Sequence, residues 1–138
     1  MAEIWQSNIT GAHVYAAKMH DQRFRQMEGG LPEKYQEEEG LEKQRDIHDD
    51  LITKGLSVIT DSYLDQVELG CKERNIAYKP RSLEGKNYQE LVREANCGLY
   101  DLLVLGSVGL GAVQSSRVGT VCERVVRRST IDTLVIKD

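Results

Sequence analysis

The stretch of residues 100–129 restricts the fold most, because it joins an apolar run, a glycine-rich loop and a helical pattern. The run from Leu102 to Leu105 is short and ends at a glycine, as expected of a buried parallel strand. Four glycines then follow within the loop: Gly106, Gly109, Gly111 and Gly119. Glycines let a backbone come close to another group, so we expect the strand to open into a turn that a ligand can approach.

The residues after this loop predict a helix that packs on a sheet. Its apolar positions recur at the i, i+3, i+4 and i+7 spacing: Val118, Val121, Cys122 and Val125. A strand, a glycine loop and a helix in this order favour phosphate binding, because successive N–H groups of such a loop form a concave anion site. The amino end of the helix adds unpaired N–H groups and the positive end of the helix dipole. The stretch therefore predicts a phosphate site.

Length and composition indicate the class of protein. A chain of 138 residues suits one domain with one core, and 40% apolar with 29% charged residues indicates a globular, soluble protein. The formal net charge of −4 argues against a broad nucleic-acid surface. The sequence shows neither an apolar run long enough to cross a bilayer nor the pattern of a secretory signal. We therefore expect a cytoplasmic protein that binds neither nucleic acid nor a membrane.

The residues that commonly bind metals are scattered. Cys71, Cys97 and Cys122 are odd in number and form no CxxC pair, which predicts reduced thiols rather than a zinc site. The histidines at positions 13, 20 and 48 have no ligand-like spacing, so we expect surface or strand-end positions for them. The sequence thus predicts no metal site.

The rest of the chain alternates between helical and extended patterns. Residues 2–10 carry a short helical stripe that Gly11 is expected to end, residues 13–19 indicate a strand, and residues 21–35 indicate a mobile polar loop. A helical pattern covers about residues 36–74, with a break expected near Gly40 because glycine costs roughly 1 kcal/mol relative to alanine in a helix. A strand at residues 76–78 should end at Pro80; a helix at 88–96 and a last strand at 133–137 follow. Such alternation predicts an α/β fold with a parallel sheet covered on both faces.

The glycine loop resembles that of a known family. Gly106 and Gly109, nine further residues and then Gly119-Thr120 match the G-x2-G-x9-G-[S/T] loop of universal stress protein domains. The preceding residues 101–106, the closing residues 134–136 and residues 11–14, placed as a second strand, are similar to that family too. The resemblance runs over residues 2–138 and implies one domain, 1–138, with an atypical insertion at about residues 21–40.

The resemblance implies a three-layer α/β fold like that of the adenine nucleotide alpha hydrolases. The family's parallel sheet has five strands in the order 3-2-1-4-5, and its nucleotide-binding members hold ATP or a related nucleotide at the carboxyl end near strands 1 and 4, in keeping with the general rule for open α/β sheets. The family begins with an apolar strand that ends in aspartate, whereas this chain begins in what resembles the back half of the following helix. We therefore expect four strands in the order 3-2-(1 missing)-4-5.

Three outcomes are open for the missing strand. The second and fourth strands could pair directly, giving 3-2-4-5; another chain could supply a strand; or the upstream part of a longer protein could complete the sheet. An unpaired central edge would promote association, because it exposes backbone donors and acceptors.

The same resemblance implies which residues bind the ligand. The phosphates of ATP or AMP would lie against the backbone of Gly106, Ser107 and Gly109 and against the turn of Gly119 and Thr120, with Mg²⁺ present only if ATP binds. The hydroxyl of Thr120 would add one hydrogen bond.

Some of these residues also have explanations that need no ligand. Glycines at positions 106 and 109 could serve turns with positive φ, and Thr120 could cap the helix. Met19, placed at the end of the second strand, would meet the adenine, although a core methionine is the commoner explanation.

The loop lacks the side chains of a phosphoryl-transfer site. Between Gly106 and Cys122 there is no Asp, Glu or His, and Arg117 is the only charged residue. Phosphoryl transfer needs an acid to hold a metal and a residue to position the nucleophile, so we predict binding without efficient hydrolysis. The sequence contains no GxxxxGK[ST] motif, and the dinucleotide fingerprint fails at its third glycine.

Two functions agree with these observations. The first is a non-catalytic nucleotide-binding regulatory or stress-response module. The alternative is an interaction module of the same fold, in which the nucleotide site is lost with the first strand. In either case we expect a homodimer formed through the last strand or the exposed sheet edge, or association with other domains of a longer protein.

Overall fold

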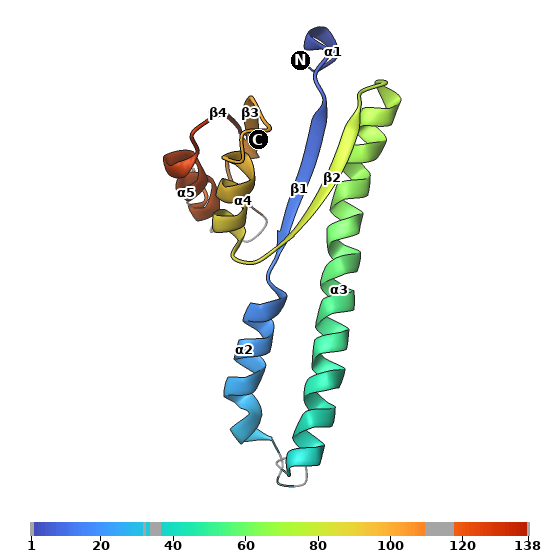
Figure 1. Cartoon of the computed structure of the whole chain (residues 1–138), viewed down its shortest axis with the longest axis vertical. Coiled ribbons are helices and arrows are strands. Elements are labelled where there is room, and N and C mark those ends of the chain that lie inside the picture. Colours follow the sequence, from blue (N-terminus) through green and yellow to red (C-terminus); the bar gives the residue numbers. More distant parts are fainter. Residues whose placement is uncertain (1, 32, 34–36, 110–117, 138) are drawn as a thin grey trace. The chain divides into compact units, whose positions relative to one another are not determined.

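The computed structural model describes residues 2–31, 33, 37–109 and 118–137, with the backbone alone for residues 19–21. Contacts divide the chain into two compact units, Met1–Gly85 and Lys86–Asp138, each described here by itself. Helices alternate with parallel strands in both units, as the sequence predicted for an α/β protein (Figure 1). No helix in the described ranges is both long and apolar enough to cross a membrane.

A parallel pair of strands forms the centre of the first unit. After a short helix α1 (Ala2–Trp5), strand β1 (Ile9–Tyr15) runs beside β2 (Tyr78–Glu84), with Ile9 opposite Tyr78. The predictions of a helix ending at Gly11 and of a strand over residues 13–19 are therefore wrong. Gly11 lies inside β1, where an added Cβ would fall 2.4 Å from the hydroxyl oxygen of Tyr78. The glycine is required by close approach of this ring, and not by the end of a helix.

The end of β2 was also predicted wrongly. Pro80 does not stop the strand, because it pairs in register with Gly11 and the strand continues to Glu84. A proline lacks the N–H that a ladder needs on both sides, so it fits a strand with one neighbour. Within the described residues, β2 has that single neighbour, β1.

Residues predicted as a mobile loop form helix α2 (Ala17–Met27) and a 3-10 turn η1 (Glu28–Gly30). Figure 1 shows α2 beside the amino-terminal half of α3 (Glu38–Glu73). Tertiary contacts hold it there: the ring of Phe24 stacks on His48 at 4.2 Å, and Arg45 donates two hydrogen bonds to Glu28, at 2.5 and 2.6 Å. The polar composition that indicated a loop belongs to the outer face of a packed helix.

The long helix was predicted correctly, but the break near Gly40 was not. Helix α3 is continuous through Gly40, and its acidic first turn suits the helix dipole. Thr60, Leu64 and Cys71 are buried on the side of α3 that packs on β1 and β2. The cost of the glycines, on the order of 1 kcal/mol each, is therefore offset by packing along the helix.

The second unit contains the loop region on which the fold prediction rests. Helix α4 (Asn87–Ala95) packs against α5 (Thr120–Arg128), and strand β3 (Leu102–Gly106) runs parallel to β4 (Asp132–Ile136). All four elements were predicted, and each begins within two residues of its predicted start. The side chain of Asn96 ties the end of α4 to the chain after α5, with hydrogen bonds of 3.0 Å to the Arg128 carbonyl and of 2.9 and 3.1 Å from Thr130.

The four described strands thus form two parallel pairs, β1 with β2 and β3 with β4. Both pairs are neighbours in the predicted order 3-2-(1 missing)-4-5. The arrangement of all four strands in one sheet, the absent first strand and the single domain stay predictions. The apolar run of β3 predicted a strand buried on both faces, yet Leu102 and Val104 are 38% and 53% exposed.

Candidate functional site

The predicted phosphate loop begins at the carboxyl end of β3 and returns to the amino end of α5. The N–H of Ser107 donates to the carbonyl of Ile136 at 2.7 Å, which extends the parallel ladder by one bond. The N–H of Gly119 then donates to the carbonyl of Ser107 at 2.6 Å. This second bond closes the base of the loop and holds the start of α5 next to the end of β3. Residues 110–117, among them Gly111 and Arg117, lie outside the described residues.

The described loop glycines do not serve positive φ angles. The left-handed residues of the described chain are Gln6, Asn75, Gly85 and Gly98, so the turn explanation offered for Gly106 and Gly109 fails. A Cβ on Gly119 would lie 3.4 Å from the Ser107 carbonyl oxygen and from the Cα of Val108, which is a tight approach of two backbones. A Cβ on Gly106 would make only ordinary contact, at 3.6 Å.

Gly109 differs from the other two, because an added Cβ there would meet no described atom within 4 Å. As far as the described atoms go, there is room for a bound group next to this backbone. Of the predicted site residues, Gly109 is thus the one at which a larger side chain would obstruct a ligand without disturbing the described protein.

Backbone donors remain available at the start of α5. The first helical hydrogen bond runs from the N–H of Glu123 to the carbonyl of Gly119, at 3.0 Å. Within the described ranges, the N–H groups of Thr120, Val121 and Cys122 have no hydrogen-bond acceptor, nor do those of Val108 and Gly109. Unpaired donors at a helix amino end, together with the helix dipole, favour an anion.

The capping role considered for Thr120 is wrong. Gly119 occupies the N-cap position with extended dihedral angles, and Thr120 is the first residue of α5, where its side chain is exposed. No side chain caps the helix. The Thr120 hydroxyl is therefore not engaged in a capping bond, and no side chain satisfies the first N–H groups of the helix.

One charged residue near the site escaped the sequence analysis. Glu123 lies in the first turn of α5 and forms an ion pair of 2.9 Å with Arg127, four residues further along the helix. The i, i+4 spacing of the two residues was the available signal. This pairing offsets part of the negative charge that would otherwise oppose an anion at the same helix end.

The structure brings together five of the six predicted site residues: Gly106, Ser107, Gly109, Gly119 and Thr120. Ser107 is buried, with 5% of its surface exposed. Met19 belongs to the other unit; it lies in α2 rather than at the end of a strand, and its side chain is outside the described part. The prediction placed it wrongly because β1 ends four residues earlier, at Tyr15.

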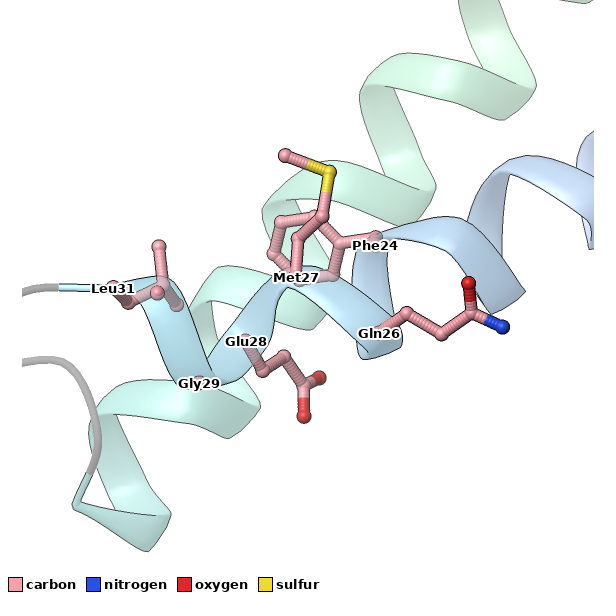
Figure 2. A pocket seen from close by; sticks show the side chains of 7 residues that line it. Phe24, Gln26, Met27, Glu28, Gly29 and Leu31 are labelled. Carbon is pink, nitrogen blue, oxygen red and sulfur yellow. The ribbon is translucent and has the colours of Figure 1, made fainter.

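A second concave region lies in the first unit, at the end of α2. It is an open hollow of about 450 Å³, lined by side chains of α2 and η1 (Figure 2). Its acidic residue, Glu28, has a pKa held below the usual 4.5 by the hydrogen bonds from Arg45. That carboxylate is already paired, and no other charged side chain among the described residues lines the hollow, so we interpret it as a packing feature. The sequence did not reveal it because residues 21–35 predicted a loop.

His13 is a half-buried residue in the middle of β1, and not a surface or strand-end histidine as predicted. Its Nδ1 forms a hydrogen bond of 3.0 Å with the hydroxyl of the fully buried Thr60, and its ring stacks on Tyr63 at 5.2 Å. Burial lowers the pKa of His13 below 6.5. This neutral, packed histidine joins β1 to α3 and is a structural contact.

Comparison with family models identifies the family of this chain. A family model described as the universal stress protein family matches residues 4–137. A crystal structure of a universal stress protein in complex with cAMP superposes with a TM-score of 0.48 and 19% identity, over 99% of this chain and 78% of that one. Among curated proteins no match is found. Since the family model takes in both units, from β1 and its preceding helix to β4, the chain belongs to the universal stress protein family.

Proposed function

We propose that this chain is a nucleotide-binding regulatory module in which the loop between β3 and α5 holds the phosphates of ATP or AMP. The observation that carries the proposal is a set of N–H groups, at Thr120, Val121 and Cys122, that have no acceptor among the described residues. They lie next to Gly109, where an added Cβ would meet no described atom within 4 Å. Membership of the universal stress protein family supports the same loop. Mg²⁺ would enter only with ATP.

The donors that have no acceptor among the described residues indicate where the phosphate would lie. The N–H groups of Ser107 and Gly119 already donate to carbonyl oxygens, so they hold the loop together rather than bind the ligand. The phosphate would instead meet the N–H groups of Val108, Gly109 and the first turn of α5. Charge-assisted hydrogen bonds to an oxyanion are shorter and about twice as strong as neutral ones, which suits these donors to a phosphate.

We further propose that the bound nucleotide is not efficiently hydrolysed. Phosphoryl transfer requires a metal-holding acid and a group that positions the attacking oxygen. The nearest acid of the described loop region, Glu123, is paired with Arg127. The module would therefore respond to the nucleotide concentration, which sets the fraction of the protein with nucleotide bound.

A second candidate is an interaction module without a nucleotide. The observation that favours it is the exposed apolar surface of the second sheet, where Leu102, Val104 and Ile136 are 38%, 53% and 48% exposed. Exposed apolar patches of this kind mark surfaces that bind another protein. A homodimer through β4, or through the edge of β3 that pairs with no described strand, would place a second copy beside this surface.

Calorimetric titration of the purified chain separates the two candidates. ATP, AMP and cAMP are each titrated to millimolar concentration, with and without Mg²⁺. We expect saturable binding of an adenine nucleotide. Absence of saturation for all three would reject the nucleotide-binding module and leave the interaction module.

A valine substitution at Gly109 tests the location of the site. Its side chain would enter the open space, so Gly109→Val should abolish binding while the urea unfolding midpoint stays unchanged. Gly29→Val is the matched control, because a Cβ there also meets nothing within 4 Å, but it lies in η1. Equal affinity in wild type and Gly109→Val would place the nucleotide elsewhere.

A further inference from the structure

We propose that the long helix α3 pairs antiparallel with α3 of a second copy of this chain, through an apolar stripe centred on Val58. The stripe consists of four exposed residues: Ile47, Leu51, Val58 and Leu69. The stripe belongs to the first unit, and β3 and β4 to the second, so the inference uses other residues than both candidates above.

The stripe follows from the spacing of its residues. Ile47, Val58 and Leu69 are separated by eleven residues each, which is close to three full turns, so they lie along one line of the helix. Leu51 is one turn from Ile47 on the same side. Their exposed fractions are 46% for Ile47, 66% for Leu51, 68% for Val58 and 61% for Leu69. The stripe extends over roughly 33 Å of helix, taking 1.5 Å per residue.

The opposite side of α3 already has its partners. Thr60, Leu64 and Cys71 are buried there, the hydroxyl of Tyr78 donates to the Leu64 carbonyl at 3.0 Å, and His13 bonds Thr60. A helix that is apolar on two sides needs a second apolar surface to cover the other. The stripe thus has the composition of a contact surface and lacks a partner within its own unit.

The symmetry of the stripe indicates that the partner is a second copy. Ile47 and Leu69 are equally far from Val58, so a two-fold axis at Val58 brings Ile47 of each copy against Leu69 of the other. Val58 then meets its own counterpart. Ile47, Val58 and Leu69 are therefore self-complementary about this axis, as an isologous interface requires, whereas Leu51 of each copy would lie opposite the exposed Asp65 of the other.

Charges beside the stripe agree with this pairing. Lys54 and Asp61 lie four residues before and three residues after Val58, on the same flank of the helix. The two-fold axis therefore places Lys54 of each copy near Asp61 of the other. Asp61 is exposed and has no ion pair among the described residues, whereas Lys54 reaches Asp50 at 2.7 Å within its own chain. Two such pairs fix the antiparallel direction and disfavour the parallel one.

Disulfide cross-linking tests the axis directly. In a Cys97→Ser background, which removes the exposed thiol, Val58→Cys should form a dimer under mild oxidation at least ten times faster than Ile59→Cys. Ile59 is a close control, since it is 50% exposed and adjacent in sequence but turned by about 100° around the helix. Equal rates for the two variants would overturn the proposal.

Sedimentation equilibrium of the untagged chain gives the second measurement. We expect a concentration-dependent dimer whose Kd rises at least tenfold in Val58→Asp, because the two introduced carboxylates would face each other. Circular dichroism confirms that the variant keeps its helix. Val104→Asp, on the sheet surface of the second unit, should leave this Kd unchanged. A wild-type chain that stays monomeric, or a dimer lost in Val104→Asp but kept in Val58→Asp, would contradict the α3 pairing.

Discussion

Replacing Gly11 with alanine should destabilise the first unit, because the ring of Tyr78 occupies the space that a side chain would need. A Cβ at position 11 would lie 2.4 Å from the Tyr78 hydroxyl oxygen, 2.8 Å from Cε2 and 3.0 Å from Cζ. The ring cannot move away freely, since its hydroxyl donates to the Leu64 carbonyl at 3.0 Å. Either the strands separate locally or this hydrogen bond breaks.

The expected magnitude combines three effects. Overpacking by one methyl group costs about 1–3 kcal/mol. Loss of the Tyr78 hydrogen bond adds about 1 kcal/mol. The lower backbone entropy of alanine in a strand returns roughly 0.5–1 kcal/mol. The net expectation is a decrease of about 1–3.5 kcal/mol in the free energy of unfolding, because the overpacking and the lost hydrogen bond together outweigh the entropy gain.

Urea unfolding followed by circular dichroism measures this change as a lower midpoint at constant slope. Gly106→Ala is a suitable control, because its Cβ would make only an ordinary contact at 3.6 Å. In the double variant Gly11→Ala/Tyr78→Val the clash is absent, so the loss should be smaller than the sum of the two single losses. A Gly11→Ala protein as stable as wild type, or additive losses in the double variant, would refute the steric explanation.

Three further predictions concern other parts of the chain. Asn96→Ala removes the three side-chain hydrogen bonds between the end of α4 and the segment after α5, so the free energy of unfolding should fall by about 1 kcal/mol. Asn96→Asp keeps the acceptor oxygen and should lose less. An unchanged free energy of unfolding in both variants would show that these bonds contribute nothing. Burial lowers the pKa of His13 below 6.5, so the unfolded chain binds the proton first as the pH falls. The stability that the neutral His13 contributes should therefore be fully present above about pH 6.5 and decrease below it. In His13→Gln the urea midpoint should decline less between pH 7 and 5 than in wild type, and an equal decline would contradict this. In the native protein one thiol, Cys97, should react rapidly with Ellman's reagent, and the two buried thiols only after unfolding; three fast thiols would disagree with the burial pattern.

Sequence patterns predicted those parts of the fold whose signals are local. The apolar run of β3, the heptad-like spacing of α5 and the long periodicity of α3 each lie within one element, and all three elements occur where the patterns indicated. The glycine loop was predicted on the same basis, and five of its residues lie together. Periodicity predicts these elements because the side chains on the buried face of a helix or strand recur at a fixed spacing along the sequence.

Contacts between distant residues decided the rest. Gly11 carries the local signal of a helix end, yet it lies within a strand because Tyr78, far along the chain, packs over it. Residues 21–30 carry the composition of a loop, yet they lie in a helix and a 3-10 turn because His48 and Arg45 give Phe24 and Glu28 partners on α3. The free donors at Thr120 and the occupied ones at Ser107 and Gly119 are likewise properties of the folded loop. The sequence by itself determined the class of fold and the position of the candidate site. Only the tertiary structure decided which backbone N–H groups have no acceptor among the described residues. The physical reason is that hydrogen bonds and steric contacts between distant segments exist only once the chain is folded.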